Sequence, residues 1–96
     1  MPDFGDQRVM GCSRADLERW VREMCGPAAA GFVADRLDLA PAGLPVAIVV
    51  RDAPPRRLGM VRFRELDVRF EYATADRDVA RRWIAEFDRH TQRGGG

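Results

Sequence analysis

Three side chains in this sequence have the chemistry of soft metal ligands or nucleophiles, namely Cys12, Cys25 and His90. They show neither C-x-x-C nor H-x-x-x-H spacing, and a tetrahedral zinc site needs four ligands, so no metal site is predicted. Cys12 directly precedes Ser13, the expected N-cap of a helix, and a helix N-terminus can lower the pKa of a thiol. Cys12 is therefore the better candidate for a reactive group. Cys25 and His90 fall at the margins of apolar helix faces, where we expect structural roles.

The sequence contains no complete catalytic motif. It has no Ser/His/Asp set with a nucleophile elbow, no H-E-x-x-H, no glycine loop for phosphate and no paired carboxylates in an apolar setting. We therefore predict no catalytic residue and no cofactor, and an enzyme is not the favoured interpretation. In a chain this short, we would expect an active site to form between subunits.

Arginine supplies all 16 basic residues of the sequence. Its guanidinium group is a planar fork of donors that can hold a carboxylate or phosphate through two hydrogen bonds. Four arginines are expected on the solvent face of the predicted sheet, as a candidate patch for anions or nucleic acid: Arg51, Arg62, Arg64 and Arg69. Arg56 and Arg57 are expected in the adjoining loop. The alternative is a solvated face balanced by Glu65 and Asp67, and the formal net charge of +1 gives no sign of nucleic-acid binding by the molecule as a whole.

Three glycines, Gly94, Gly95 and Gly96, stand at the end of the sequence. Because glycine has no Cβ, such a tail can enter a narrow channel of a partner enzyme, as in sulfur carriers and ubiquitin-like proteins. In those proteins the glycines follow a strand of a β-grasp sheet, whereas here they follow a predicted helix. Three interpretations stay open: a helix stop with a disordered end, a docking tail and a carrier tail.

Three helical segments are predicted to position these residues. Residues 13–25 repeat apolar side chains every three or four positions, begin with an N-cap at Ser13 and are followed by a Gly-Pro pair. Residues 76–92 show the same apolar spacing. Residues 28–39 form a weaker helical pattern, which Gly31 interrupts.

Three strands are predicted in the second half of the chain, at residues 45–51, 58–65 and 68–72. The first is apolar on both faces and rich in β-branched side chains, and the other two alternate between apolar and charged residues. Matching the apolar faces of the second and third strands places Phe63 opposite Phe70.

These elements predict an α+β fold with the order α-(α)-β-β-β-α, in which a three-stranded antiparallel meander packs on helices as a two-layer sandwich. The length suits a single domain, residues 1–96, with flexible ends at residues 1–6 and 91–96 and a further short strand at residues 7–11. The predicted core is Trp20, Val21, Met24, Ile48, Val61, Phe63, Phe70, Tyr72, Trp83 and Phe87.

The composition, 46% hydrophobic and 32% charged, is typical of a small soluble domain. The longest apolar run, residues 46–50, is too short to span a membrane, and the first ten residues show no signal-peptide pattern. Two cysteines do not make a disulfide framework. We therefore expect a cytoplasmic protein with no membrane partner.

In a three-stranded meander the strand at residues 45–51 would lie at an edge, although it is apolar on both faces. An exposed apolar edge tends to pair with another chain. We therefore predict a homodimer with an interface at Val46, Ile48, Val49 and Val50. The favoured function is a small non-enzymatic interaction or accessory protein, which acts by self-association and by docking to a larger protein partner. Two alternatives stay open: a module that binds anions or nucleic acid through the arginine face, and a carrier that acts through its C-terminal glycines.

Overall fold

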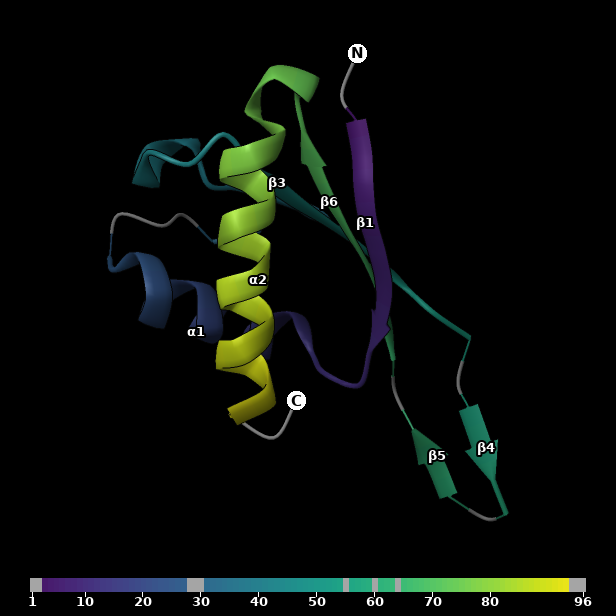
Figure 1. Ribbon diagram of the computed structural model, residues 1–96. Helices are drawn as coiled ribbons and strands as arrows, with labels where there is room; N and C mark the ends of the chain where they lie inside the picture. The colour runs from purple at the N-terminus through teal and green to yellow at the C-terminus, as the bar shows by residue number, and fades with distance from the viewer. Residues whose placement is uncertain (1–2, 28–30, 55, 60, 64, 94–96) are drawn as a thin grey trace.

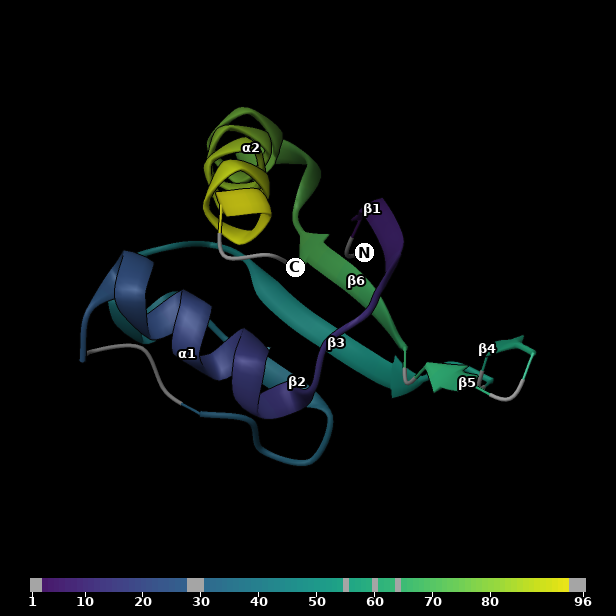
Figure 2. The same cartoon turned by 90° about the horizontal axis from the view of Figure 1, so that it is seen from below.

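A computed structural model describes residues 3–27, 31–54, 56–59, 61–63 and 65–93 of the chain. They form an α+β fold with a four-stranded antiparallel sheet, two helices on one face of the sheet and nothing over the other (Figures 1 and 2). The elements in chain order are β1 (Asp3–Met10), α1 (Arg14–Cys25), β2 (Arg36–Asp38), η1 (Ala40–Ala42), β3 (Ala47–Asp52), β4 (Arg56–Leu58), β5 (Val61–Phe63), β6 (Leu66–Tyr72), η2 (Thr74–Asp76) and α2 (Arg77–Arg93).

Helix α1 confirms the helix predicted at residues 13–25. The hydroxyl of Ser13 accepts a hydrogen bond from the backbone N–H of Asp16 at 3.1 Å, and the Asp16 carboxylate accepts one from the backbone N–H of Ser13 at 3.0 Å. This capping box holds the pKa of Asp16 below its ordinary value, because the hydrogen bonds from Ser13 favour the ionised carboxylate. The backbone N–H groups of Ser13 and Asp16, at the start of α1, therefore have hydrogen-bond acceptors within the chain.

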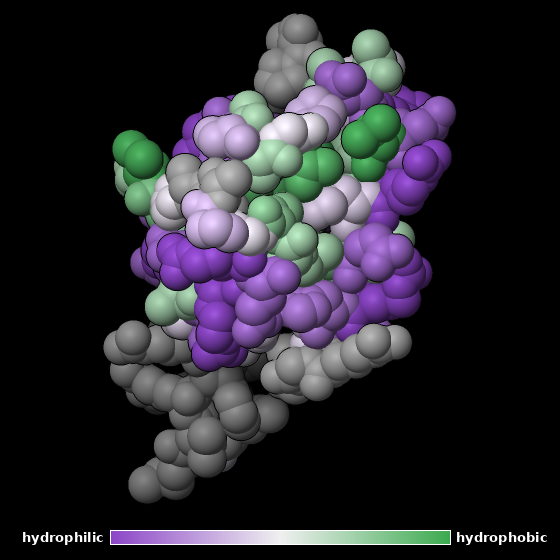
Figure 3. Space-filling view, turned by 90° about the vertical axis from the view of Figure 1, so that its left-hand side faces the viewer, coloured by the Kyte–Doolittle hydropathy of each residue, from purple (hydrophilic) through white to green (hydrophobic). Residues whose placement is uncertain are grey.

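Helix α2 confirms the helix predicted at residues 76–92. The predicted flexible ends overlap regular structure, because residues 3–6 lie in β1 and residues 91–93 lie in α2. The remaining residues of those ends lie outside the described part. The outer surface of the helical layer is mainly hydrophilic, with hydrophobic residues gathered near its middle (Figure 3).

The prediction of a helix at residues 28–39 is wrong. Within this range residues 28–30 lie outside the described part, and residues 36–38 form strand β2 along the edge of β3. Leu37 and Leu39 are buried, whereas Arg36 and Asp38 are exposed. This alternation of buried and exposed residues has the period of a strand. It covers too few residues to be recognised in the sequence, where the helical spacing of the preceding apolar residues is the stronger pattern.

The predicted meander is also wrong, because the sheet has the order β1-β6-β3-β2. Strand β6 lies between β1 and β3, and Phe70 faces Ile48 rather than Phe63. Strand β3, predicted at an edge, is an internal strand between β6 and β2. Residues 7–10 of the short strand predicted at residues 7–11 belong to β1, which pairs with β6 from Asp3 to Met10 with a bulge between Phe4 and Asp6.

An aromatic cluster forms the centre of the core, between the sheet and α2. The ring of Phe70 lies edge-on to Trp83 and Phe87, with centroids 6.3 and 5.6 Å away. Arg8 extends from the inner face of β1 over the ring of Phe70, at 5.2 Å from its centroid, and pairs with Asp88 of α2. This contact ties the outermost strand of the sheet to the helix that covers it.

Most of the predicted core is confirmed. Trp20, Val21, Ile48, Phe70, Tyr72, Trp83 and Phe87 are buried, and Met24 is partly buried against them. The side chains of Val61 and Phe63 lie outside the described part of the structure.

Candidate functional site

Charge is distributed very unevenly along the chain. The segment between β3 and β6 that contains β4 and β5, residues 54–64, carries four arginines and no acidic residue. The other 85 residues carry twelve arginines and fifteen acidic residues, so their formal charge is −3. The net charge of +1 therefore conceals a basic segment, here named the arm (residues 54–64), on an acidic body.

The arm projects from one end of the molecule as a hairpin of β4 and β5 (Figures 1 and 2). It continues the ladder between β3 and β6, whose last backbone hydrogen bond runs from the N–H of Ala53 to the carbonyl of Glu65 at 3.1 Å. Pro54 follows at once, and proline cannot donate to a ladder. Three residues separate β3 from β4 but two separate β5 from β6, so the register shifts by one residue at the root of the arm.

A tight turn closes the arm, and sequence reasoning missed it. Leu58 pairs with Val61, which leaves two residues for the turn, and Gly59 occupies the first of them with φ +63°. A left-handed backbone at this position is what two-residue hairpins require, and glycine adopts it without strain. The prediction of one continuous strand at residues 58–65 is therefore wrong, and Gly59 was the signal that could have located the turn.

The pairing of β4 with β5 places two arginines at opposed backbone positions of the arm. Arg57 of β4 is the direct partner of Arg62 of β5, and Arg56 is paired with Phe63. Two like charges at opposed positions of a ladder repel each other unless an anion lies between them. Arg56 and Arg57, which we expected in a loop, thus join Arg62 on a projecting ribbon.

Two of the four arginines of the predicted patch, Arg51 and Arg69, lie in strands of the four-stranded sheet. Arg51 lies 3.5 Å from Asp67, and Arg69 follows Asp67 by two positions on the same face of β6. Nearby, Arg36 pairs with Glu71 at 2.8 Å. Arg62 belongs to the arm, and Arg64 lies outside the described residues. The carboxylates beside Arg51 and Arg36 fit the charge-balanced interpretation of the open face, and an anion site there stays a prediction.

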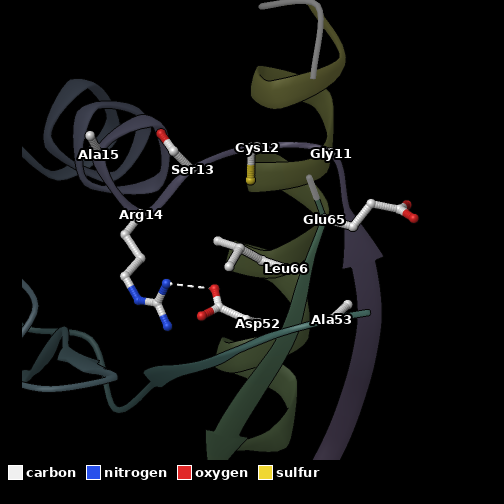
Figure 4. Close-up of a pocket in the computed structure, with 9 residues that line it drawn as sticks. All are labelled: Gly11, Cys12, Ser13, Arg14, Ala15, Asp52, Ala53, Glu65 and Leu66. Atoms are coloured by element: carbon white, nitrogen blue, oxygen red, sulfur yellow. Dashed lines mark hydrogen bonds and ion pairs between the residues drawn. The ribbon is translucent and has the colours of Figure 1, made fainter. Parts of the chain in front are cut away.

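A hollow of about 790 Å³ lies at the root of the arm, between the start of α1, the end of β3 and the start of β6 (Figure 4). Arg14 projects from α1 beside it and donates to Asp52 at 2.9 Å and to Asp35 at 2.8 Å. These hydrogen bonds raise the pKa of Arg14, which stays a cation neutralised by two carboxylates. Arg14 therefore joins three segments of the chain and has little capacity left for a bound anion. The hollow is lined by Gly11, Cys12, Ser13, Arg14, Ala15, Asp52, Ala53, Glu65 and Leu66.

Cys12, the better candidate for a reactive group, lies in this hollow with a raised pKa. Burial and, to a smaller extent, the nearby negative charge of Asp16 together raise the pKa of its thiol from 9.0 to about 11. The carboxylate in the capping box thus opposes the effect of the helix N-terminus. At neutral pH the thiol is protonated, so the hollow supplies no nucleophile from Cys12.

We expect Cys12 to react with iodoacetamide at pH 8 about 100-fold more slowly than an ordinary cysteine, because only the thiolate reacts. Intact mass spectrometry of a Cys25→Ser variant would follow Cys12 alone, and the same variant in urea supplies the unhindered rate. The raised pKa also fixes the sign of the pH effect on folding. Between about pH 9 and 11 the folded thiol keeps a proton that the unfolded thiol loses, so stability falls as pH rises through this window. A folded-state rate equal to that in urea would contradict the assignment.

The other soft ligands lie apart from Cys12. His90 of α2 is within 2.7 Å of Glu23 of α1, a contact that links the two helices. The pKa of Cys25 is raised, mainly by burial, although a hydrogen bond with Trp83 acts in the opposite direction. Among the residues that the structure describes, no three potential metal ligands gather in one place.

Two further sets of predicted site residues can now be placed. Val46, Ile48 and Val50 are buried in the core of their own chain, and Val49 is partly buried. The edge position that suggested an interface at these residues is wrong, because β3 is internal. Gly94, Gly95 and Gly96 lie outside the described residues, directly after the end of α2.

No family model, curated protein or solved structure matches this chain. Neither helix in the described part of the chain has the length and apolar character needed to cross a bilayer.

Proposed function

We propose that the protein is a non-catalytic binding module, which docks to a polyanionic partner, a nucleic acid, through the arm. The observation that carries this proposal is the separation of charge between a projecting ribbon with four arginines and a body with a formal charge of −3. The function proposed is thus docking to a larger partner, and the contact surface proposed is the arm rather than the open face of the sheet.

The register of the arm supports a phosphate-bearing partner. Arg57 and Arg62 occupy opposed positions, so the repulsion between them is relieved when a phosphate neutralises both. Arginine holds phosphate through two parallel hydrogen bonds, which lysine cannot form. The acidic body repels the same partner, so contact through the arm is electrostatically favoured over contact through the helices.

Fluorescence anisotropy with labelled DNA, as a single strand and as its duplex, tests this proposal. If each arginine of the arm neutralises one phosphate, the slope of log K against log salt on the duplex should be about −3.6, a loss of roughly 150-fold between 50 and 200 mM salt. The double variant Arg57→Gln/Arg62→Gln should reduce the slope to about −1.8.

The matched control is Arg19→Gln/Arg22→Gln, which removes the same charge from the exposed face of α1. The slope of this control should equal that of the parent. Absence of salt-sensitive binding to both DNA probes, or an equal loss in the two double variants, would contradict the proposal.

Self-association is a second proposal, now through β1. This strand has eight residues and lies at an edge of the sheet, with β6 as its one neighbour, and Val9 on it is 57% exposed. Light scattering at micromolar concentration should give twice the chain mass of 10.8 kDa. Val9→Lys should give the monomer mass, because a charged residue on an edge strand opposes pairing. Val33→Lys, at a position 77% exposed, is the control. A parent mass of 10.8 kDa at all concentrations would refute the dimer.

A further inference from the structure

We infer that Arg14 is a positioning residue for the arm, because its guanidinium group fixes the root of the arm against the start of α1. This inference rests on the proposed function and adds the residue that sets the direction of the arm. The residues that carry it all lie in the body, namely Arg14, Asp35, Asp52, Ala53 and Glu65.

The root of the arm joins the body at the end of the β3–β6 ladder. Asp52 pairs with Leu66 there, and the N–H of Ala53 donates to the carbonyl of Glu65 at 3.1 Å. Pro54 follows and has no N–H with which to extend the ladder. A ribbon that starts at such an interruption can change direction relative to the body, unless a side chain holds its base.

The side chain of Arg14 holds this root. Its Nη1 donates to Asp52 at 2.9 Å, whereas its Nε and Nη2 donate to Asp35 at 3.2 and 2.8 Å. Both carboxylates lie along β3, since Asp52 is its last residue and the N–H of Val50 donates to the carbonyl of Asp35 at 2.9 Å. Figure 4 shows the contact between Arg14 and Asp52 at the edge of the hollow.

The position of Arg14 on α1 makes this contact firm. Arg14 is the first residue of the helix, next to the capping box of Ser13 and Asp16, which fixes the backbone there. Its side chain is 34% exposed and lies between two carboxylates, which hold it by charge-assisted hydrogen bonds. Arg14 therefore acts on the arm through Asp52 rather than by contact with the nucleic acid.

A fixed root should raise the affinity of the arm. A ribbon already held in one direction loses less conformational entropy when a partner immobilises it, so it binds more tightly. The opposite effect of charge makes this role testable. Asp52→Asn removes a negative charge beside the arm, which by charge alone would strengthen binding to a polyanion. Loss of the contact with Arg14 should instead weaken binding.

Fluorescence anisotropy of Asp52→Asn with the DNA duplex tests this inference. We expect the affinity to fall about threefold. The slope of log K against log salt should stay that of the parent, because every arginine of the arm is retained. Arg14→Lys, which keeps the charge but lacks the fork that reaches both carboxylates, should also weaken binding. The matched control is Glu71→Gln, which removes the same charge and breaks the contact with Arg36 at the other end of β6, and it should bind at least as tightly as the parent.

Hydrogen exchange of backbone amides gives a readout that needs no nucleic acid. In Asp52→Asn and in Arg14→Lys the amide of Ala53 should exchange at least about threefold faster than in the parent, because the root opens locally. The amide of Phe70, in the middle of β6, should exchange at its parent rate. A general loss of stability would instead accelerate exchange at both amides.

The outcomes separate the positioning role from the proposed function. Exchange at Ala53 that stays at the parent rate in both variants, or tighter binding of Asp52→Asn than of the parent, overturns the role of Arg14 and leaves the proposed function standing. Equal acceleration at Ala53 and Phe70 overturns it in the same way. Absence of DNA binding by the parent overturns the proposed function, and the positioning role with it.

Discussion

Replacement of Phe70 by alanine should lower the free energy of unfolding by about 3–5 kcal/mol, the usual cost of emptying an aromatic site in a packed core. Phe70 has no exposed surface, lies on the central strand β6 and contacts both Trp83 and Phe87. Its removal leaves a cavity between two layers of the fold and removes the ring beneath Arg8. For a domain of this size the loss should lower Tm by at least about 12 °C.

Urea denaturation followed by tryptophan fluorescence would measure the loss, because Trp83 is a neighbour of the deleted ring. Val79→Ala is the matched control, since Val79 is 47% exposed on the same layer of the molecule. It should change the free energy of unfolding by less than about 0.5 kcal/mol. Similar effects for the two variants would mean that Phe70 is not at the centre of the core.

Removal of the arm should abolish binding to DNA while the body stays folded. Ala53 and Glu65 form the last pair of the β3–β6 ladder, so an Asn-Gly turn in place of residues 54–64 closes the same ladder with a favoured two-residue loop. The change removes four arginines and reverses the net charge from +1 to −3. We expect affinity for duplex DNA to fall on the order of 100-fold or more.

The thermal stability of the shortened protein is the control for this experiment. The core cluster of the side chains that the structure describes is held by α1, α2, the four-stranded sheet and the segment around Leu39, so we expect Tm to stay close to that of the parent. A shortened protein that binds DNA as tightly as the parent would place the interface on the body. A shortened protein that fails to fold would show that the arm packs against the core, and the Arg57→Gln/Arg62→Gln variant would then decide the binding question.

The sequence predicted the parts of the fold that local patterns control. Both helices follow from apolar spacing and capping residues, and Ser13 with Asp16 forms the expected start of α1. The strand around Ile48 follows from a run of β-branched residues. Strand β2 was missed because three residues give too little alternation to define a period.

Long-range pairing could not be predicted from local patterns. Residues 3–10 pair with residues 66–72, and no local rule connects segments so far apart. The arm was hidden for two reasons. Gly-Met is a weaker turn signal than Asn-Gly, and acidic residues elsewhere cancel the charge of Arg56, Arg57, Arg62 and Arg64 in the total. Counting charge segment by segment would have exposed the basic run.

The position of β6 between β1 and β3 also fixes an order of events during synthesis. β1 is made before the other strands of this sheet, yet its partner β6 is complete only when Tyr72 has been made. Until then β1 has no neighbour in the sheet, and its unpaired backbone is open to other chains. β3 and β6, joined through the arm, are close in the chain and have the smaller loop to close. We therefore expect β3 and β6 to pair first and β1 to join the sheet last, which makes unpaired β1 the segment that a chaperone would protect during synthesis.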